Sequence, residues 1–214
     1  MKNNFKWHKE LIDGKWYSVC DHEHVPMIEH TKEETLASGM KYFIIFSLLA
    51  FLAVVVYMPL LRHFIQPAYW EGLGVVPIVM MAEIFMGVYF NLSFWYKLTD
   101  KTWWGAVMSA AGAAVMIAVN VLFVPVIGYW ACAWGGFAGY GTAMLLSLFI
   151  GGRYFPVPYD WKTILGFAAL AIGTYAFMSA LSMMWPDMNS WLFMAVGTVL
   201  LVAYTLFAWR ELRR

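Results

Sequence analysis

Charged residues are scarce in this sequence of 214 residues. Asp, Glu, Lys and Arg together make up 13% of the chain, about half the share found in an ordinary soluble domain. Hydrophobic residues account for 62%, which is more apolar surface than a soluble domain of this length could bury. The formal net charge of +1 gives no electrostatic basis for binding nucleic acid. The composition therefore indicates an integral membrane protein.

Cysteines and catalytic motifs are also few. Cysteine occurs only at Cys20 and Cys132, which the topology derived below places on opposite sides of a membrane, so we expect no disulfide between them. The segment Cys20–His24 contains metal-capable residue types but lacks the spacing of a zinc site. The sequence contains no Walker loop, Rossmann glycines, HExxH or GxSxG element. We therefore expect no metal, no cofactor and no enzyme activity.

Six long apolar segments dominate what is present. A bilayer core of about 30 Å is crossed by roughly 20 apolar residues in a helix, and every backbone group in hydrocarbon must find its partner within the structure. The predicted spans are Tyr42–Leu61, Leu73–Tyr96, Trp103–Ile127, Tyr129–Ile150, Thr163–Trp185 and Trp191–Trp209. The sequence thus predicts an all-α membrane protein, with a polar segment over residues 1–37 and a six-helix transmembrane domain over residues 38–214.

The lysines and arginines predict how this domain lies in the membrane. With six spans, thirteen of the fourteen fall on one side, and only Arg62 falls on the other. Cytoplasmic loops of membrane proteins carry an excess of Lys and Arg. We therefore expect both the N-terminus and the C-terminus in the cytoplasm.

Glu83 is the one ionisable residue deep inside a predicted span. A carboxylate in lipid is costly, so we expect Glu83 to face the bundle interior or a hydrated cavity. Gly87 and Asn91 follow at four-residue spacing and would form a polar stripe with it. Two interpretations stay open. Glu83 is either a proton-linked, cation-linked or headgroup-binding carboxylate in a transport pathway, or a neutral glutamate that hydrogen-bonds helices together.

Small residues recur at every fourth position in the third and fourth spans. They are Ala106, Ala110, Ala114 and Ala118 in the third span and Ala131, Gly135 and Gly139 in the fourth. Such stripes let helices approach closely, within the bundle or against neighbours outside the chain, and the glycines also allow a flexible helix. Late in the third span, Asn120 and Pro125 indicate either a kink that frees backbone carbonyls or an ordinary helix end.

Several stretches resemble one family of transporters. The residues that carry the likeness are Met40–Phe43 at the start of the first span, Lys97 and Lys101 in a short basic loop, Asn120, and the turn residues Pro125, Gly128 and Ala131. Over residues 31–214 the chain resembles the later part of bacterial Wzx-like oligosaccharide flippases, of the multidrug/oligosaccharidyl-lipid/polysaccharide exporter superfamily.

The resemblance implies transport of a lipid-linked oligosaccharide for surface polysaccharide and lipopolysaccharide assembly, across the bacterial inner membrane. Family members have two lobes of about fourteen helices in total, with substrate bound between the lobes. This chain resembles only the trailing six helices, so a missing N-terminal half or a partner chain is implied. On this reading Glu83, Asn91 and Asn120 are candidates for the transport pathway.

Two other functions stay open at this point. An accessory membrane subunit or scaffold without transport of its own would suit the stripes of small residues and the short chain. A membrane-embedded lipid-modifying enzyme would need clustered acid–base groups, and the loops offer only Asp100, Asp160 and Asp187.

Overall fold

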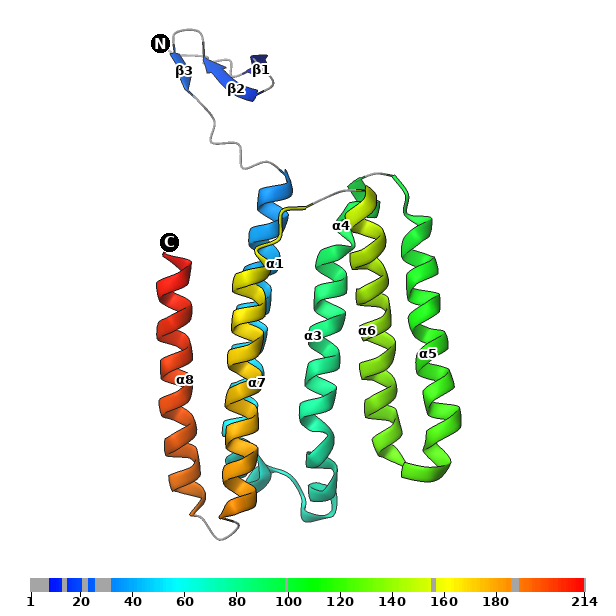
Figure 1. The fold of residues 1–214 in the computed structure, drawn as a ribbon, viewed down its shortest axis with the longest axis vertical. Coiled ribbons are helices and arrows are strands. Elements are labelled where there is room, and N and C mark those ends of the chain that lie inside the picture. The colour runs from blue at the N-terminus through cyan, green and yellow to red at the C-terminus, as the bar shows by residue number, and fades with distance from the viewer. Residues whose placement is uncertain are drawn as a thin grey trace, which may run out of the picture.

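Long helices carry most of the chain (Figure 1). The computed structural model describes residues 8–12, 15–20, 23–25, 32–98, 100–154, 157–185 and 189–213. The long helices in these ranges are α1 (Lys32–Val56), α3 (Val76–Leu92), α5 (Trp103–Ile127), α6 (Tyr129–Tyr154), α7 (Trp161–Met184) and α8 (Ser190–Leu212). The short elements are α2 (Met58–Leu61), η1 (Arg62–Phe64) and η2 (Pro67–Val75), which join α1 to α3, and α4 (Phe94–Leu98), which follows α3.

The predicted six-helix membrane bundle is confirmed. Among the described residues, six helical segments are long and apolar enough to cross a membrane, and the chain is a multi-pass membrane protein. The predicted span Trp103–Ile127 agrees with α5 residue for residue. In contrast, α1 begins at Lys32, ten positions before the predicted start at Tyr42. Lys, Glu, Leu and Ala favour helix, so the helix extends beyond the apolar run that marked the span.

A small antiparallel sheet precedes the helices. Its strands are β1 (His8–Ile12), β2 (Lys15–Cys20) and β3 (Glu23–Val25), paired in the order β1-β2-β3. The register places Ile12 opposite Lys15, so two residues connect β1 to β2. In the sequence those residues are Asp13 and Gly14, a pair favoured in two-residue hairpins. The prediction of a polar segment over residues 1–37 does not include this hairpin.

The ends of the bundle differ in charge. The start of α1 and the end of α8 lie at the same end (Figure 1), as six crossings require. We call this the basic end, because it holds Lys41, Lys97, Lys101, Arg153, Lys162 and Arg210. The opposite end holds Arg62 in η1, followed by η2.

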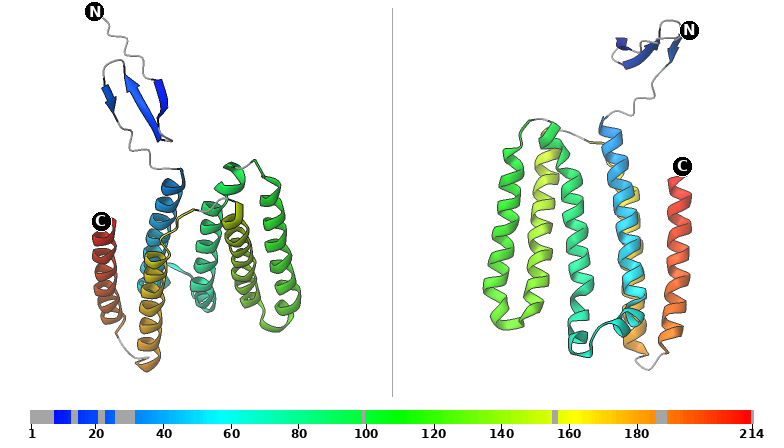
Figure 2. Two further views of the ribbon diagram at one scale, coloured as in Figure 1. Left: turned by 45° about the horizontal axis from the view of Figure 1, so that its top comes forward. Right: turned by 180° about the vertical axis from the view of Figure 1, so that it is seen from behind.

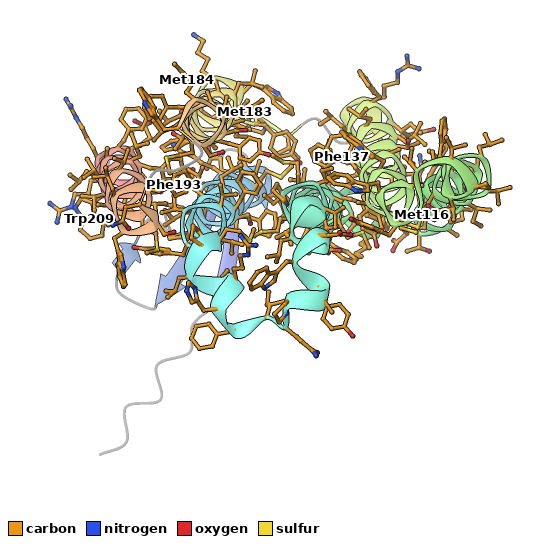
Figure 3. All side chains as sticks on the ribbon, turned by 90° about the horizontal axis from the view of Figure 1, so that it is seen from below. Met116, Phe137, Met183, Met184, Phe193 and Trp209 are labelled. Carbon is orange, nitrogen blue, oxygen red and sulfur yellow. The ribbon has the colours of Figure 1, made fainter. Side chains whose placement is uncertain are left out.

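The six helices form two clusters of three. In one, α7 and α8 pack on α1; in the other, α5 packs on α6 and α6 packs on α3. Views from behind and along the helix axes show the clusters side by side, joined where α1 meets α3 (Figures 2 and 3). Large buried side chains fill the first cluster, including Ile45, Leu52 and Phe167. The hydroxyl of Tyr204 in α8 donates a hydrogen bond to the Ile45 carbonyl at 3.2 Å.

An ion pair closes the first cluster at the basic end. The Lys41 ammonium lies 3.6 Å from the Asp160 carboxylate and 3.7 Å from that of Glu211. Asp160 also caps α7 by accepting a hydrogen bond from the Thr163 amide at 3.3 Å. The hydrogen bonds from Thr163, and then the nearby Lys41, lower the pKa of Asp160. Lys41 thus ties α1 to the start of α7 and the end of α8.

Candidate functional site

Glu83 lies in the middle part of α3 and is exposed on the surface of the six helices. The buried residues of α3, among them Ala82 and Tyr89, pack within the bundle. Val79 and Phe90 share the exposed side with Glu83. Within the described part of the chain, Glu83 forms no hydrogen bond and no ion pair. The structure therefore places this carboxylate at lipid depth on a face that the described helices leave uncovered.

Gly87 and Asn91 lie near Glu83 on α3 but have local roles. Any side chain at Gly87 would overlap the ring of Phe43 from α1, so this glycine sets how closely α1 and α3 approach. The side-chain amide of the half-buried Asn91 donates to the Gly87 carbonyl at 3.1 Å. Of the predicted polar stripe, Glu83 alone presents a side chain without a partner among the described residues.

Asn120 lies in a different place, in the contact between α5 and α6. Its side-chain oxygen is buried and has no hydrogen-bond partner. A Cβ atom at Gly135 of α6 would lie 2.6 Å from that oxygen. Asn120 therefore points into the α5–α6 contact, whereas Glu83 points away from the bundle, and the structure does not join them into one site.

The remaining predicted hinge and packing residues belong to the same pair of helices. Gly139 and Gly112 meet backbone to backbone, since a Cβ on either would lie 2.8 Å from the carbonyl oxygen of the other. Pro125 stands inside α5, near its last turn. The helix ends at Gly128, whose φ of +60° is a conformation that favours glycine. These residues fix a tight α5–turn–α6 hairpin.

The alanine stripe of α5 does not pack against the described part of the chain. All four of its members, Ala106, Ala110, Ala114 and Ala118, are exposed. The buried side of α5 is instead formed by Met108 and Gly112. A second helix could approach this stripe closely.

An open cavity of about 1140 Å³ lies at the opposite end, between the end of α1, η2 and the α7–α8 connection. Its polar lining includes Arg62, His63 and Glu71. The Arg62 guanidinium lies 3.8 Å from the centre of the Trp70 ring. The Trp70 indole in turn donates to the carbonyls of Arg62 at 3.2 Å and Ile65 at 3.0 Å, which holds the cation and the ring together.

In the sequence, Arg62 stands out only as the exception to the charge asymmetry. The signal that could have revealed the cavity is the grouping of Arg62, His63, Trp70 and Glu71 in one connection between spans. His63 is positioned by its Nδ1, which donates to the Pro59 carbonyl at 2.8 Å. This arrangement leaves its Nε2 available to a ligand in the cavity.

A smaller cavity of about 270 Å³ lies at the basic end, beside Trp95, Ser147 and Tyr159. The Trp95 indole donates to the buried Ser147 hydroxyl at 3.2 Å. Burial raises the pKa of Tyr159 from its ordinary value of 10.0 to about 12. The residues that line this cavity therefore suit a structural role better than acid–base catalysis.

Among the described side chains, the residue types that could serve a metal site or an enzyme are dispersed. The described residues contain no group of three or more His, Cys, Asp or Glu side chains that could hold a metal ion. Cys132 is an exposed free thiol. Of the loop aspartates, Asp160 is engaged as a helix cap, and Asp187 lies outside the described residues. The side chains of Cys20–His24 also lie outside that part of the chain.

Together these features define a multi-pass membrane protein with a mid-span carboxylate on an uncovered face and an open, partly polar cavity at one end. Comparison with protein-family models, characterised proteins and solved structures gives no match.

Proposed function

We propose that the chain is part of a transporter that moves lipid-linked oligosaccharides across the bacterial inner membrane for surface polysaccharide assembly. In this proposal its termini are cytoplasmic, and the exposed face of α3 lines the pathway opposite another helical bundle. The observation that carries the proposal is the exposed position of Glu83 at mid-span, without a partner among the described residues.

The energetics of Glu83 favour a hydrated pathway. A charged side chain facing lipid at the bilayer centre costs about 3 kcal/mol even on lenient scales. Water in a pathway between two bundles would remove most of that cost and leave the carboxylate free to bind a proton, a cation or a polar headgroup. The stripe of Val79, Glu83 and Phe90 would then form one wall of the pathway.

The cavity at the opposite end supports a sugar-containing cargo. Sugar hydroxyls hydrogen-bond to charged side chains such as Arg62 and Glu71, and the C–H faces of sugar rings stack on indoles. Trp70 and Trp185 both line this cavity. A polar headgroup would use this space while its lipid tail remains in the bilayer.

The exposed alanine stripe of α5 favours a second candidate, an accessory subunit or scaffold. Small residues at four-residue spacing form surfaces on which another transmembrane helix packs. A scaffold would also cover the Glu83 face, but with a dry contact between helices. The two candidates therefore differ in whether water reaches Glu83.

Complementation tests the proposal. The full chain is expressed in a flippase-deficient strain, alone and with the partner bundle that co-purifies with it, and surface polysaccharide is measured. We expect the chain, expressed together with that bundle, to restore polysaccharide. Glu83→Gln should then lower the yield at least tenfold, whereas the matched change Glu34→Gln, at the exposed start of α1, should leave it unchanged.

Two results would reject parts of this proposal. A chain that neither restores polysaccharide nor co-purifies with another bundle is not part of such a transporter. Full restoration by Glu83→Gln would remove Glu83 from the transport pathway.

A further inference from the structure

One cation and several aromatic rings line a pocket at the basic end that the proposed transport pathway does not use, and a second cation lies beside it. The pocket has a volume of about 540 Å³ and lies between the start of α5 and the end of α6. Its lining residues are Trp104, Phe149, Ile150, Arg153 and Tyr154. Lys101 adjoins it, with its ammonium 3.9 Å from the centre of the Tyr154 ring. We call this the α5–α6 pocket.

Stacked rings build the wall of the α5–α6 pocket. Tyr154 stacks on the buried Trp95 with ring centres 5.5 Å apart and planes 4° apart. Trp104 lies 6.2 Å from Tyr154 and stacks on Trp103 at 4.3 Å. The Tyr154 ring, over which the Lys101 ammonium lies, is therefore held in place by neighbouring aromatic rings.

The positive charge of the pocket has no acidic partner in the described part of the chain. Neither Lys101 nor Arg153 forms an ion pair there. Asp100, the acidic residue adjacent to Lys101 in the sequence, pairs with neither cation. At this end, by contrast, Lys41 is neutralised by Asp160 and Glu211. The α5–α6 pocket is therefore complementary to an anion.

An apolar track continues from the cations toward the bilayer centre. Phe149 and Leu145 precede Arg153 on α6 by four and eight positions, so the three side chains lie along one stripe. Phe149 is 70% exposed and Leu145 is 47% exposed. An anionic headgroup at Arg153 would therefore have room for an attached acyl chain along α6.

We propose that the α5–α6 pocket binds the phosphate of an anionic membrane lipid of the phosphatidylglycerol class. Lys101 and Arg153 donate charge-assisted hydrogen bonds to the phosphate oxygens, the tryptophans sit at headgroup depth, and an acyl chain lies on Leu145 and Phe149. Basic pockets between helices on the cytoplasmic side are suited to such headgroups. The lipid bridges α5 and α6 at the basic end, whatever cargo the protein moves.

Native mass spectrometry of the detergent-purified full chain tests this assignment, with phosphatidylglycerol and phosphatidylcholine titrated separately. The double variant K101Q/R153Q should weaken phosphatidylglycerol binding by about tenfold for each cation removed, the usual worth of one charge-assisted hydrogen bond. The matched control R210Q/R213Q removes two cations from the same end, one of them also over a ring, since Arg213 lies 4.7 Å from the Trp209 ring centre. The control should bind as the unmodified chain does.

Three results would overturn the assignment. Equal weakening in both double variants would mean that the lipid responds only to total charge. Equal binding of phosphatidylcholine, which has a phosphate but no net charge, would mean that the pocket does not select lipids with a net negative charge. Displacement of the lipid by inorganic phosphate at millimolar concentration would make the pocket a free-phosphate site. A thermal melt of each variant in the same detergent verifies that it is folded. Arg153, Arg210 and Arg213 are exposed, and Lys101 is half-buried.

Discussion

The two three-helix clusters are held together in different ways. In the cluster of α1, α7 and α8, large side chains such as Leu52, Phe167 and Tyr204 fill the space between helices. In the hairpin of α5 and α6, Gly112 and Gly139 have no side chains, so the two backbones come into contact. Lipid tails are as apolar as leucine, so helices in a bilayer associate through packing rather than through the hydrophobic effect. One chain therefore shows two ways of gaining that packing: large side chains fill the space between helices, or small residues let the helix backbones come into contact.

The largest effect on stability is expected where the close contact between the α5 and α6 backbones is disrupted. Gly139→Leu places a side chain where a Cβ alone would lie 2.8 Å from the Gly112 carbonyl oxygen. The α5–α6 hairpin must then separate, and we expect the free energy of unfolding to fall by about 3 kcal/mol. Unfolding by SDS in mixed micelles measures this change.

Gly173→Leu in α7 is the matched control. Nothing lies within 4 Å of a Cβ at Gly173, and leucine favours helix over glycine by roughly 1 kcal/mol. Stability should stay constant or rise. Equal losses in both variants would contradict the claim that close backbone approach holds α5 to α6.

The next largest effect on stability is expected when a large buried side chain is shortened in the cluster of α1, α7 and α8. Phe167→Ala in α7 leaves a hole beside Tyr204, whose ring centre lies 5.5 Å from that of Phe167. We expect a loss of about 2 kcal/mol, below the value for a water-soluble core because lipid replaces water outside the bundle. Phe177→Ala on the same helix, where the ring is 52% exposed, should cost much less. Similar losses would show that the interior of this cluster is not tightly packed.

A smaller effect is expected at the cap of α7. Asp160→Ala removes the hydrogen bond to the Thr163 amide and should cost about 1 kcal/mol. Asp160→Asn keeps a capping oxygen and should cost less. Because the pKa of Asp160 is lowered from its ordinary value of 3.8, its contribution is complete above that value and is lost as the pH falls through the lowered pKa. If the stability difference between the unmodified chain and the Asp160→Asn variant stays constant as the pH is lowered through this range, the charge has no such role.

The helices could be predicted from the sequence because lipid imposes length and apolarity on each crossing. Trp103–Ile127 is correct at both ends for this reason. The direction in which Glu83 points could not be predicted, since one carboxylate in an apolar helix does not indicate which side packs on neighbours. That side is set by tertiary contacts, such as Phe43 against Gly87.

The shapes of the cavity beside Arg62 and of the α5–α6 pocket could not be predicted from the sequence, although the grouping of Arg62, His63, Trp70 and Glu71 in one connection indicates the first. The cavity beside Arg62 depends on η2 folding back toward the α7–α8 connection, and the α5–α6 pocket depends on Tyr154 meeting Lys101 across a loop. Both bring together residues from ends of different helices. Spacing along one helix carries no information about such contacts.

Water access to Glu83 tests the central claim most directly. In a chain whose native cysteines are replaced by serine, Glu83→Cys and Val199→Cys are each treated in membranes with a membrane-impermeant thiol reagent. Val199 is 68% exposed and lies in the middle part of α8, as Glu83 does in α3, which makes it a lipid-facing control. If the α3 face lines a hydrated pathway, Cys at position 83 reacts at least tenfold faster than Cys at position 199. Equal, slow reaction at both positions would contradict a transport pathway along α3.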